Sequence, residues 1–363
     1  MRAMLKDAVP FAAVGRALVI KLRHHGDVLL AAPVFSTLKR AAPHGEIDAL
    51  VYADTVPMLE GHPAIARIHT IDRGWKRQGI AAQARAEWGL LQALRARRYD
   101  LVVHLTEHPR GAWLSRLLAP HWAVAPRQPG RFWRGSFTHQ VPRPPARRHT
   151  VELHLDALRR IGLQPTAADK AVTLVPGPAA AARVTELLAA HGLATGRFIH
   201  LHPASRWLFK CWPAEKFAAL CRALGERGWP IVLTAAPAAD EIALVAAIRR
   251  QIPAPPPSAI IDLSGQLTLK ELAALTARAR LFVGVDSAPM HIAAAMGIPV
   301  VALFGPSGDK EWGPWQAESR VVVSERHPCR PCGHDGCGGG KLSACLDELS
   351  VERVYAACEE LLA

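Results

Sequence analysis

The stretch LFVGVDSAPMHIAAAMGIPVVALFGPSG, residues 281–308, decides the fold. Its first part, LFVGV, is a short apolar run of the kind that forms a buried strand. A helix-like run, PMHIAAAMG, follows, and a second apolar run, PVVALFG, ends the stretch. A strand, a helix and a strand in this order predict two parallel strands with a helix packed on their sheet.

The junction between the first strand and the helix carries polar side chains. Asp286 and Ser287 precede the helix, and Pro289 lies in its first turn, so plain capping is one explanation for these residues. His291 also lies near the helix start, where backbone N–H groups and the helix dipole attract an anion. A helix N-terminus with an acid and a histidine beside it also suits a diphosphate.

The same rhythm of strands and helices runs along both halves of the chain. Apolar strand-like runs occur at 17–22, 46–52, 65–72 and 99–105, and again in the second half, with helix-like segments between them. We therefore expect an α/β protein with two doubly wound, Rossmann-like domains that face each other across a cleft. The predicted divisions are an N-terminal domain at 1–176, a second domain at 177–349 and a C-terminal helix at 350–363. Residues 109–145 interrupt the rhythm and predict a mobile substrate loop or an irregular edge.

Positive charge is concentrated in the first half. Residues 1–176 hold 26 Lys/Arg and 13 Asp/Glu, whereas residues 177–363 hold 18 of each. Residues 108–151 contain eight arginines and no acidic residue. Such a field favours an anionic partner, whether a phosphorylated ligand, a nucleic acid or a membrane surface, although a solvated basic loop is the simpler alternative.

Asp27 poses a similar choice. It follows Gly26 in KLRHHGDVLL (21–30), where a strand ends and a helix begins. On general grounds it is an N-cap of that helix. A carboxylate at the carboxyl end of a strand also lies where catalytic groups of doubly wound domains are found.

Three blocks of the sequence resemble the lipopolysaccharide heptosyltransferases, glycosyltransferases of the GT-B type. They are DSAPMHIAAAMGIPVVALFGPSG, IKLRHHGDVLLAAPVFSTLKRAAP and HPASRWLFKCWP. The resemblance extends from about Arg16 to the C-terminus. It implies an inverting enzyme that transfers L-glycero-D-manno-heptose from ADP-heptose to the inner core of lipopolysaccharide. A second GT-B alternative is transfer from another nucleotide sugar.

The resemblance also assigns roles to residues. Asp27 matches the proposed catalytic base of the first domain. The positions that match donor-binding residues are Ser205, Arg206, Lys210, Asp240, Leu267, Asp286, Ser287, Ala288 and His291. Among these, Lys210 matches a phosphate-binding lysine, Leu267 would line the adenine pocket and Asp240 would bind the ribose, with Glu241 as the alternative if the register shifts by one.

No cofactor is expected. Many sugar transferases hold a divalent metal with an Asp-x-Asp motif, and this chain contains none. Lys210, His291 and the helix N-terminus offer the electrostatic stabilisation that such a metal would give to the leaving diphosphate. We therefore predict metal-independent transfer.

The arginine-rich segment has a candidate partner in the acceptor. Inner-core lipopolysaccharide carries carboxylates and phosphates, which suit arginine forks, and we predict that Arg127, Arg131 and Arg134 bind it. The same charge predicts peripheral binding to the cytoplasmic face of the inner membrane. Trp113, Trp122 and Trp133 lie in or beside this segment, and each either contacts lipid or sugar or is packed in the core. The sequence shows no convincing signal peptide or membrane-spanning segment, so a cytoplasmic location is expected.

Four of the seven cysteines form a cluster, Cys329-x2-Cys332-x4-Cys337-x7-Cys345. In a cytoplasmic protein this spacing suggests structural zinc more than disulfides. The resemblance implies no zinc role, so reduced thiols, or a disulfide in the isolated protein, are the alternatives. The pattern most resembles the third-heptose branch of the family. A different class, a nucleic-acid-binding protein, is suggested by the basic half, but no reading helix or RNA motif accompanies it. A dehydrogenase is excluded because neither first strand leads into Gly-x-Gly-x-x-Gly.

Overall fold

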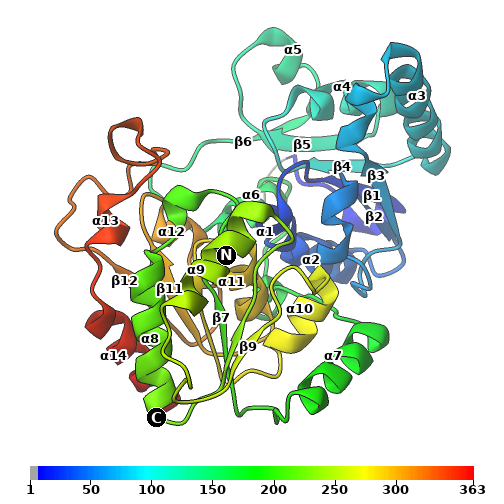
Figure 1. Ribbon diagram of the computed structural model, residues 1–363. Helices are drawn as coiled ribbons and strands as arrows, with labels where there is room; N and C mark the ends of the chain where they lie inside the picture. Colours follow the sequence, from blue (N-terminus) through cyan, green and yellow to red (C-terminus); the bar gives the residue numbers. More distant parts are fainter. Residues whose placement is uncertain (1–6) are drawn as a thin grey trace. The chain divides into compact units, whose positions relative to one another are not determined.

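The computed structural model of the protein describes residues 7–363. The chain divides into two compact units, Met1–Leu174 and Val175–Ala363. The division falls two residues before the boundary predicted at 176, and the C-terminal helix belongs to the second unit. Each unit is a sheet covered by helices on both faces (Figure 1).

The first unit contains a six-stranded parallel sheet in the order β3-β2-β1-β4-β5-β6. Its strands are β1 (Arg16–Ile20), β2 (Glu46–Tyr52), β3 (Arg67–Ile71), β4 (Leu101–His104), β5 (Trp122–Pro126) and β6 (His139–Val141). Its α-helices are α1 (His25–Leu29), α2 (Ala32–Ala41), α3 (Ile80–Arg97), α4 (Pro109–Leu118), α5 (Arg131–Arg134) and α6 (Thr150–Arg160). Helices α3 and α4 pack on one face of the sheet, and α2 and α6 contact strands from the other.

The segment 109–145 is more regular than its sequence predicts. It forms α4, β5, α5 and β6, and the two strands extend the sheet to its edge. Of the two alternatives predicted for this segment, it forms an edge of the sheet and not a loop. The sequence did not show its regular elements because the segment builds its core from aromatic rings rather than aliphatic runs. Trp133 and Phe137 are buried and pack on the imidazole of His104, with ring centroids 5.7 and 5.9 Å away.

The second unit repeats the design, with the order β12-β11-β10-β7-β8-β9. Its strands are β7 (Ile199–His202), β8 (Ile231–Leu233), β9 (Ile260–Asp262), β10 (Leu281–Val285), β11 (Val300–Phe304) and β12 (Ser319–Val323). Its helices are α7 (Pro178–Ala190), α8 (Ala214–Glu226), α9 (Ala239–Arg250), α10 (Leu269–Thr276), α11 (Ala288–Ala295), α12 (Asp309–Trp312), α13 (Ala344–Asp347) and α14 (Val351–Leu362).

Alternation along β10 shows how both faces of this second sheet are buried. Leu281, Val283 and Val285 belong to a core with α8, α9 and α14, whereas Phe282 belongs to a core with α7, α10 and α11. Gly284 pairs with His202 of β7, and a Cβ at this glycine would lie 2.7 Å from the Phe282 ring and 2.9 Å from the His202 carbonyl oxygen. The close approach of these two central strands therefore requires glycine.

Both sheets have the strand order of a doubly wound Rossmann fold, 3-2-1-4-5-6. In the second unit this order appears when its strands are listed from β9 to β12. In such a sheet, ligands bind at the carboxyl ends of the two central strands, where the chain reverses its direction of travel across the sheet. These strands are β1 and β4 in the first unit and β7 and β10 in the second. Within residues 7–363, no helix is both long and apolar enough to cross a membrane.

Candidate functional site

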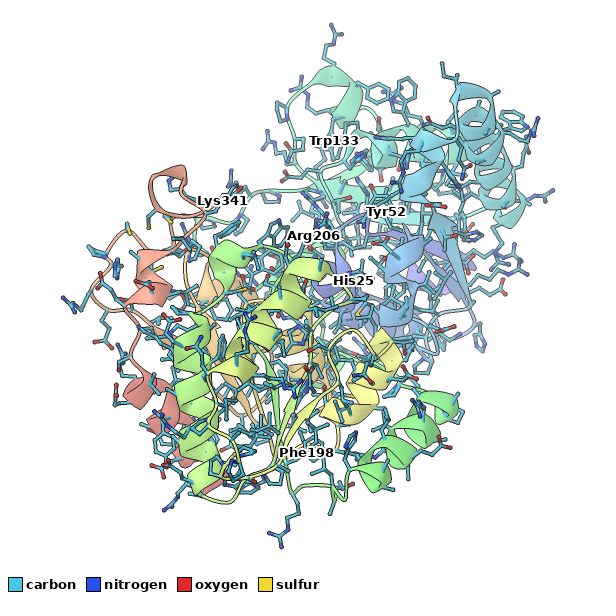
Figure 2. All side chains as sticks on the ribbon, in the orientation of Figure 1. His25, Tyr52, Trp133, Phe198, Arg206 and Lys341 are labelled. Atoms are coloured by element: carbon cyan, nitrogen blue, oxygen red, sulfur yellow. The ribbon has the colours of Figure 1, made fainter. Side chains whose placement is uncertain are left out.

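The predicted donor-binding residues of the second unit gather at the carboxyl edge of its sheet. Ser205, Arg206 and Lys210 lie on the loop that follows β7, and Asp286 and Ser287 follow β10. Figure 2 shows Phe198 and Arg206 at opposite ends of β7, with Arg206 at the edge where the strand has ended. The fold therefore brings two loops that are about 80 residues apart in the sequence to the place where a doubly wound sheet binds ligands.

An ion pair joins these two loops. The Lys210 Nζ donates to Asp286 Oδ2 at 2.6 Å, and Asp286 is only 7 % exposed. The Lys210 ammonium also lies 5.0 Å from the centre of the Trp207 ring. Sequence analysis placed both residues in the donor site but did not predict that they bind each other.

Helix α11 begins without a side-chain cap. Its N-cap residue is Ser287, whose hydroxyl donates instead to the Val285 carbonyl oxygen at 3.2 Å, and Asp286 is engaged by Lys210. The interpretation of Asp286 and Ser287 as plain caps was therefore wrong.

In the first turn of α11, Pro289 has no N–H, and the Met290 N–H donates to the Ser287 carbonyl oxygen at 3.1 Å. The Ala288 N–H, together with the positive end of the helix dipole, is therefore what this helix start offers an anion. Ala288 is the first residue of α11. His291, in the same turn, is a buried residue whose ring centroid lies 6.5 Å from that of Trp312.

The remaining predicted donor residues lie on neighbouring elements. The Ser205 hydroxyl is buried and accepts from the Trp207 N–H at 3.4 Å. Asp240 is exposed in the first turn of α9 and lines a cavity of about 480 Å³ with residues of the Lys210 loop. Its neighbour Glu241 is buried and accepts from the Ala236 N–H at 3.1 Å, and burial raises the pKa of its carboxyl group. Leu267 packs against the core that contains α10 and α11.

Asp27 lies in the first unit, inside α1 rather than at its N-cap. The N-cap residue is His24, which makes no side-chain cap bond, so the N-cap interpretation of Asp27 was wrong. One Asp27 oxygen, Oδ1, lies 3.4 Å from the Nζ of Lys21, and the Asp27 side chain is 20 % exposed. The neighbouring His25 contacts the Asp54 carbonyl oxygen at 2.9 Å.

Six of the eight arginines in residues 108–151 form two groups. Arg110, Arg116 and Arg148 are bound by side chains of their own unit. In contrast, Arg127, Arg131 and Arg134 are exposed and make no ion pair with any described residue. Arg127 follows the carboxyl end of β5, on the same edge of the sheet as Asp27, and the other two arginines lie on α5.

The three tryptophans near this segment have different environments. Trp133 is buried and donates to the Pro126 carbonyl oxygen at 3.0 Å, so it is not available to lipid or sugar. Trp122 is half-buried, whereas Trp113 is 56 % exposed. The Trp113 ring packs 4.5 Å from that of Phe132, an exposed side chain that sequence analysis did not single out.

The four clustered cysteines are free thiols. Cys345 is buried, while Cys329 and Cys337 are exposed. No three His, Cys, Asp or Glu side chains anywhere in 7–363 are placed to hold a metal ion, so the zinc hypothesis gains no support from the structure.

Sequence analysis missed Lys21 and His154. Lys21 directly follows β1 and is buried, and its Nζ lies 2.8 Å from Nε2 of His154 on α6. Lys21 carried a usable signal, because a lysine inside an apolar run must find partners when that run is buried. His154 carried none, since a histidine in an amphipathic helix does not reveal which loop it contacts.

Each Rossmann-like domain places charged side chains at the edge of its sheet where such folds bind ligands. Residues 88–342 match glycosyltransferase family 9 (heptosyltransferase), which is more than half of the chain, and the chain belongs to this family. It is therefore a glycosyltransferase.

Particular relatives make the assignment more specific. The chain is 36 % identical to lipopolysaccharide heptosyltransferase 3 of Escherichia coli K12 over 345 residues, which cover 94 % of this chain and 96 % of the relative. This similarity confirms the resemblance to the third-heptose branch.

Solved structures agree with the fold. A family 9 glycosyltransferase from Veillonella parvula superposes with a TM-score of 0.84 at 24 % identity, covering 98 % of this chain and 99 % of the other. The Escherichia coli heptosyltransferase WaaC with ADP-2-deoxy-2-fluoro heptose gives a TM-score of 0.71 at 20 % identity, covering 95 % and 99 %. The prediction of a GT-B fold with two Rossmann-like domains is thus confirmed.

Proposed function

We propose that this protein transfers L-glycero-D-manno-heptose from ADP-heptose to the inner core of lipopolysaccharide. The observation that carries the donor assignment is the Lys210–Asp286 pair beside the uncapped N-terminus of α11. An ammonium and the Ala288 N–H at a helix N-terminus are donors of the kind that bind a diphosphate. The names of the relatives, which include a lipopolysaccharide heptosyltransferase and an enzyme solved with an ADP-heptose analogue, support heptose as the sugar.

A calorimetric comparison of nucleotide sugars tests the donor assignment. We expect ADP-heptose to bind, and UDP- and GDP-sugars to bind at least ten times more weakly. Tight binding of a UDP-sugar without binding of ADP-heptose would favour the second candidate, a GT-B enzyme with another donor. Family membership already favours either enzyme over a nucleic-acid-binding protein.

In the proposed mechanism, Asp27 is the general base of an inverting transfer. Its carboxylate accepts the proton of the acceptor hydroxyl while that oxygen attacks the anomeric carbon of the heptose. The bond between the anomeric carbon and the diphosphate oxygen breaks from the opposite side, and ADP leaves with the electron pair. Asp27 supports this role because it lies at the carboxyl edge of the first sheet with one oxygen held by Lys21.

The leaving ADP gains negative charge, and we propose that Lys210, Arg206 and the α11 N-terminus stabilise it without a metal ion. Within this proposal, EDTA leaves the rate nearly unchanged. A strict requirement for added Mg²⁺ or Mn²⁺, restored by titration after EDTA treatment, would contradict it.

The acceptor is proposed to bind the first unit. Arg127, Arg131 and Arg134 are exposed and form no ion pair within residues 7–363, which suits the carboxylates and phosphates of the inner core. We also propose peripheral attachment to the inner membrane through a surface made of Trp113, Phe132 and the arginines of α5, which we call the α4–α5 surface. Here Arg116 lies 4.6 Å over the Phe132 ring, next to Trp113.

A further inference from the structure

Lys21 is a buried cation at the carboxyl end of β1. Only 4 % of the residue is exposed. Burying an ammonium carries a large desolvation free energy unless hydrogen bonds and opposite charges compensate for it. The partners of Lys21 therefore explain how its charge is tolerated at this position. Burial lowers the pKa of Lys21, and the charge of the nearby Asp27 opposes that shift.

The Lys21 ammonium has three partners. It forms hydrogen bonds with His154 Nε2 at 2.8 Å and the Leu105 carbonyl oxygen at 3.5 Å, and an ion pair with Asp27 Oδ1 at 3.4 Å. Leu105 follows β4, so Lys21 also ties together the two loops that border the ligand-binding edge of this sheet.

The hydrogen positions on His154 follow from its second contact. Nδ1 lies 3.0 Å from the Leu30 carbonyl oxygen, which can only accept. Nδ1 therefore carries the hydrogen, and Nε2 presents its lone pair to Lys21. Burial and the charge of Lys21 lower the pKa of His154 well below its usual range, which keeps the ring in this neutral form.

Asp27 is thereby fixed at one oxygen only. Across residues 7–363, Lys21 is the sole group that pairs with its carboxylate, and no backbone N–H binds it. The second oxygen, Oδ2, is left for a substrate hydroxyl. Two other titratable groups interact electrostatically with Lys21, namely Arg23 and His104. His104 is neutral because burial lowers its pKa to about 3.

We propose that Lys21 is a positioning residue, held in place by neutral His154, that orients the Asp27 carboxylate for proton transfer. This inference rests on the proposed role of Asp27 as general base. When Asp27 accepts the proton and loses its charge, the ammonium retains two neutral acceptors, His154 Nε2 and the Leu105 oxygen. Lys21 is therefore never left without partners during the reaction.

Removing the ammonium tests this role. Lys21→Met keeps the length of the side chain, and we expect kcat to fall about ten- to hundredfold because the base loses its orientation. The donor Kd and the acceptor KM should change less than about twofold. An unchanged kcat, or a loss confined to KM, would overturn the proposal.

A matched pair of histidine variants tests the link through His154. His154→Gln places an acceptor oxygen near the Nε2 position, whereas His154→Asn retains only a donor near Nδ1. We expect the Gln variant to retain most of the wild-type kcat and the Asn variant to lose as much as Lys21→Met. Equal losses in both would contradict the assignment. This pair also decides the question if Lys21→Met does not fold.

A double variant separates this inference from the base assignment. If Lys21 acts through Asp27, then adding Lys21→Met to Asp27→Asn causes no further loss of the residual turnover. Multiplied losses would show that Lys21 acts independently and would overturn the positioning role. Near-normal turnover in Asp27→Asn alone would instead remove the proposed base, whatever Lys21 does.

Discussion

At the scale of single residues, the ion pair between Lys210 and Asp286 shows how charge organises the proposed donor site of the second unit. Their ion pair joins the loops after β7 and β10, and it places an ammonium beside an uncapped helix N-terminus. The sequence indicated each residue separately, through its resemblance to a known block. It could not reveal the pair, because the partners are 76 residues apart and meet only when the sheet is assembled.

Lys210→Met should weaken ADP-heptose binding roughly ten- to hundredfold, the expected loss for one charge-assisted hydrogen bond of about 1.5–3 kcal/mol. Isothermal calorimetry measures it. The control is Lys341→Met, which removes the same charge from an exposed lysine of the same unit, labelled in Figure 2, that pairs with Asp335. Equal affinity in the Lys210 variant and the control would contradict the phosphate-binding role.

Asp27 shows a second limit of sequence patterns, which is the exact position of a helix end. Its sequence context, directly before an apolar helix, is typical of an N-cap, yet the helix starts two residues earlier at His25. Element ends shift by a residue or two relative to sequence patterns, and here the shift places Asp27 inside the helix, where its carboxylate pairs with Lys21 instead of capping.

At the scale of elements, strand β2 and helix α3 are joined by a buried network. Asp48 of β2 is fully buried and accepts from Arg97 Nε at 2.7 Å and from the Tyr99 hydroxyl at 2.7 Å. Burial alone would raise the pKa of Asp48, but hydrogen bonds from His69, Arg97 and Tyr99 outweigh it and lower the pKa to about 2.

Arg97→Met should therefore lower the free energy of unfolding of the first unit by about 3 kcal/mol or more at neutral pH, since it leaves a buried carboxylate without its cation. Because the folded pKa of Asp48 is below the unfolded value of about 3.9, this contribution is complete above about pH 4 and is lost as the pH falls toward 2. Urea unfolding of the wild type and of Arg97→Met between pH 2 and 7 measures the difference in their free energies of unfolding. A difference that does not shrink toward low pH would contradict this explanation.

Helix α4 and strands β5 and β6 are among the elements that sequence patterns did not predict. Their stabilisation comes from Trp133 and Phe137 packed around His104, and from arginine contacts such as Arg116 to the Ser136 hydroxyl at 2.8 Å. Residues of these types are also common in irregular surface loops. The pattern alone therefore could not separate a sheet edge from a loop, whereas the aliphatic runs of β1, β4, β7 and β10 identified the central strands directly.

At the scale of the whole molecule, the two units have the same strand order but different charge. The first unit carries the excess of arginine, and Arg127, Arg131 and Arg134 pair with no acid among the residues that the structure describes. The two-domain α/β design could be read from the sequence, because strand and helix patterns alternate in both halves. The division of the arginines into structural and exposed groups could not, since it depends on which acids lie beside them in the fold.

The α4–α5 surface should bind anionic membranes. Arg131→Gln with Arg134→Gln should weaken binding to phosphatidylglycerol vesicles roughly thirtyfold, at about 1 kcal/mol per arginine near an anionic surface. Trp113→Ser with Phe132→Ser should weaken it as well, whereas Ile242→Ser, an exposed apolar residue of the second unit, should not. Sedimentation with vesicles measures binding, and indifference to all of these changes would contradict the proposed surface.

The central claim is heptose transfer from ADP-heptose to an inner-core acceptor with Asp27 as the base. The most direct measurement is mass spectrometry of a delipidated inner-core oligosaccharide after incubation with ADP-heptose and either the wild-type protein or Asp27→Asn. We predict that the wild-type protein adds one heptosyl residue, while the variant is slower by at least about 100-fold yet binds ADP-heptose within about twofold of the wild type. No heptosyl product from the wild-type protein, or equal rates for both proteins, would contradict the account.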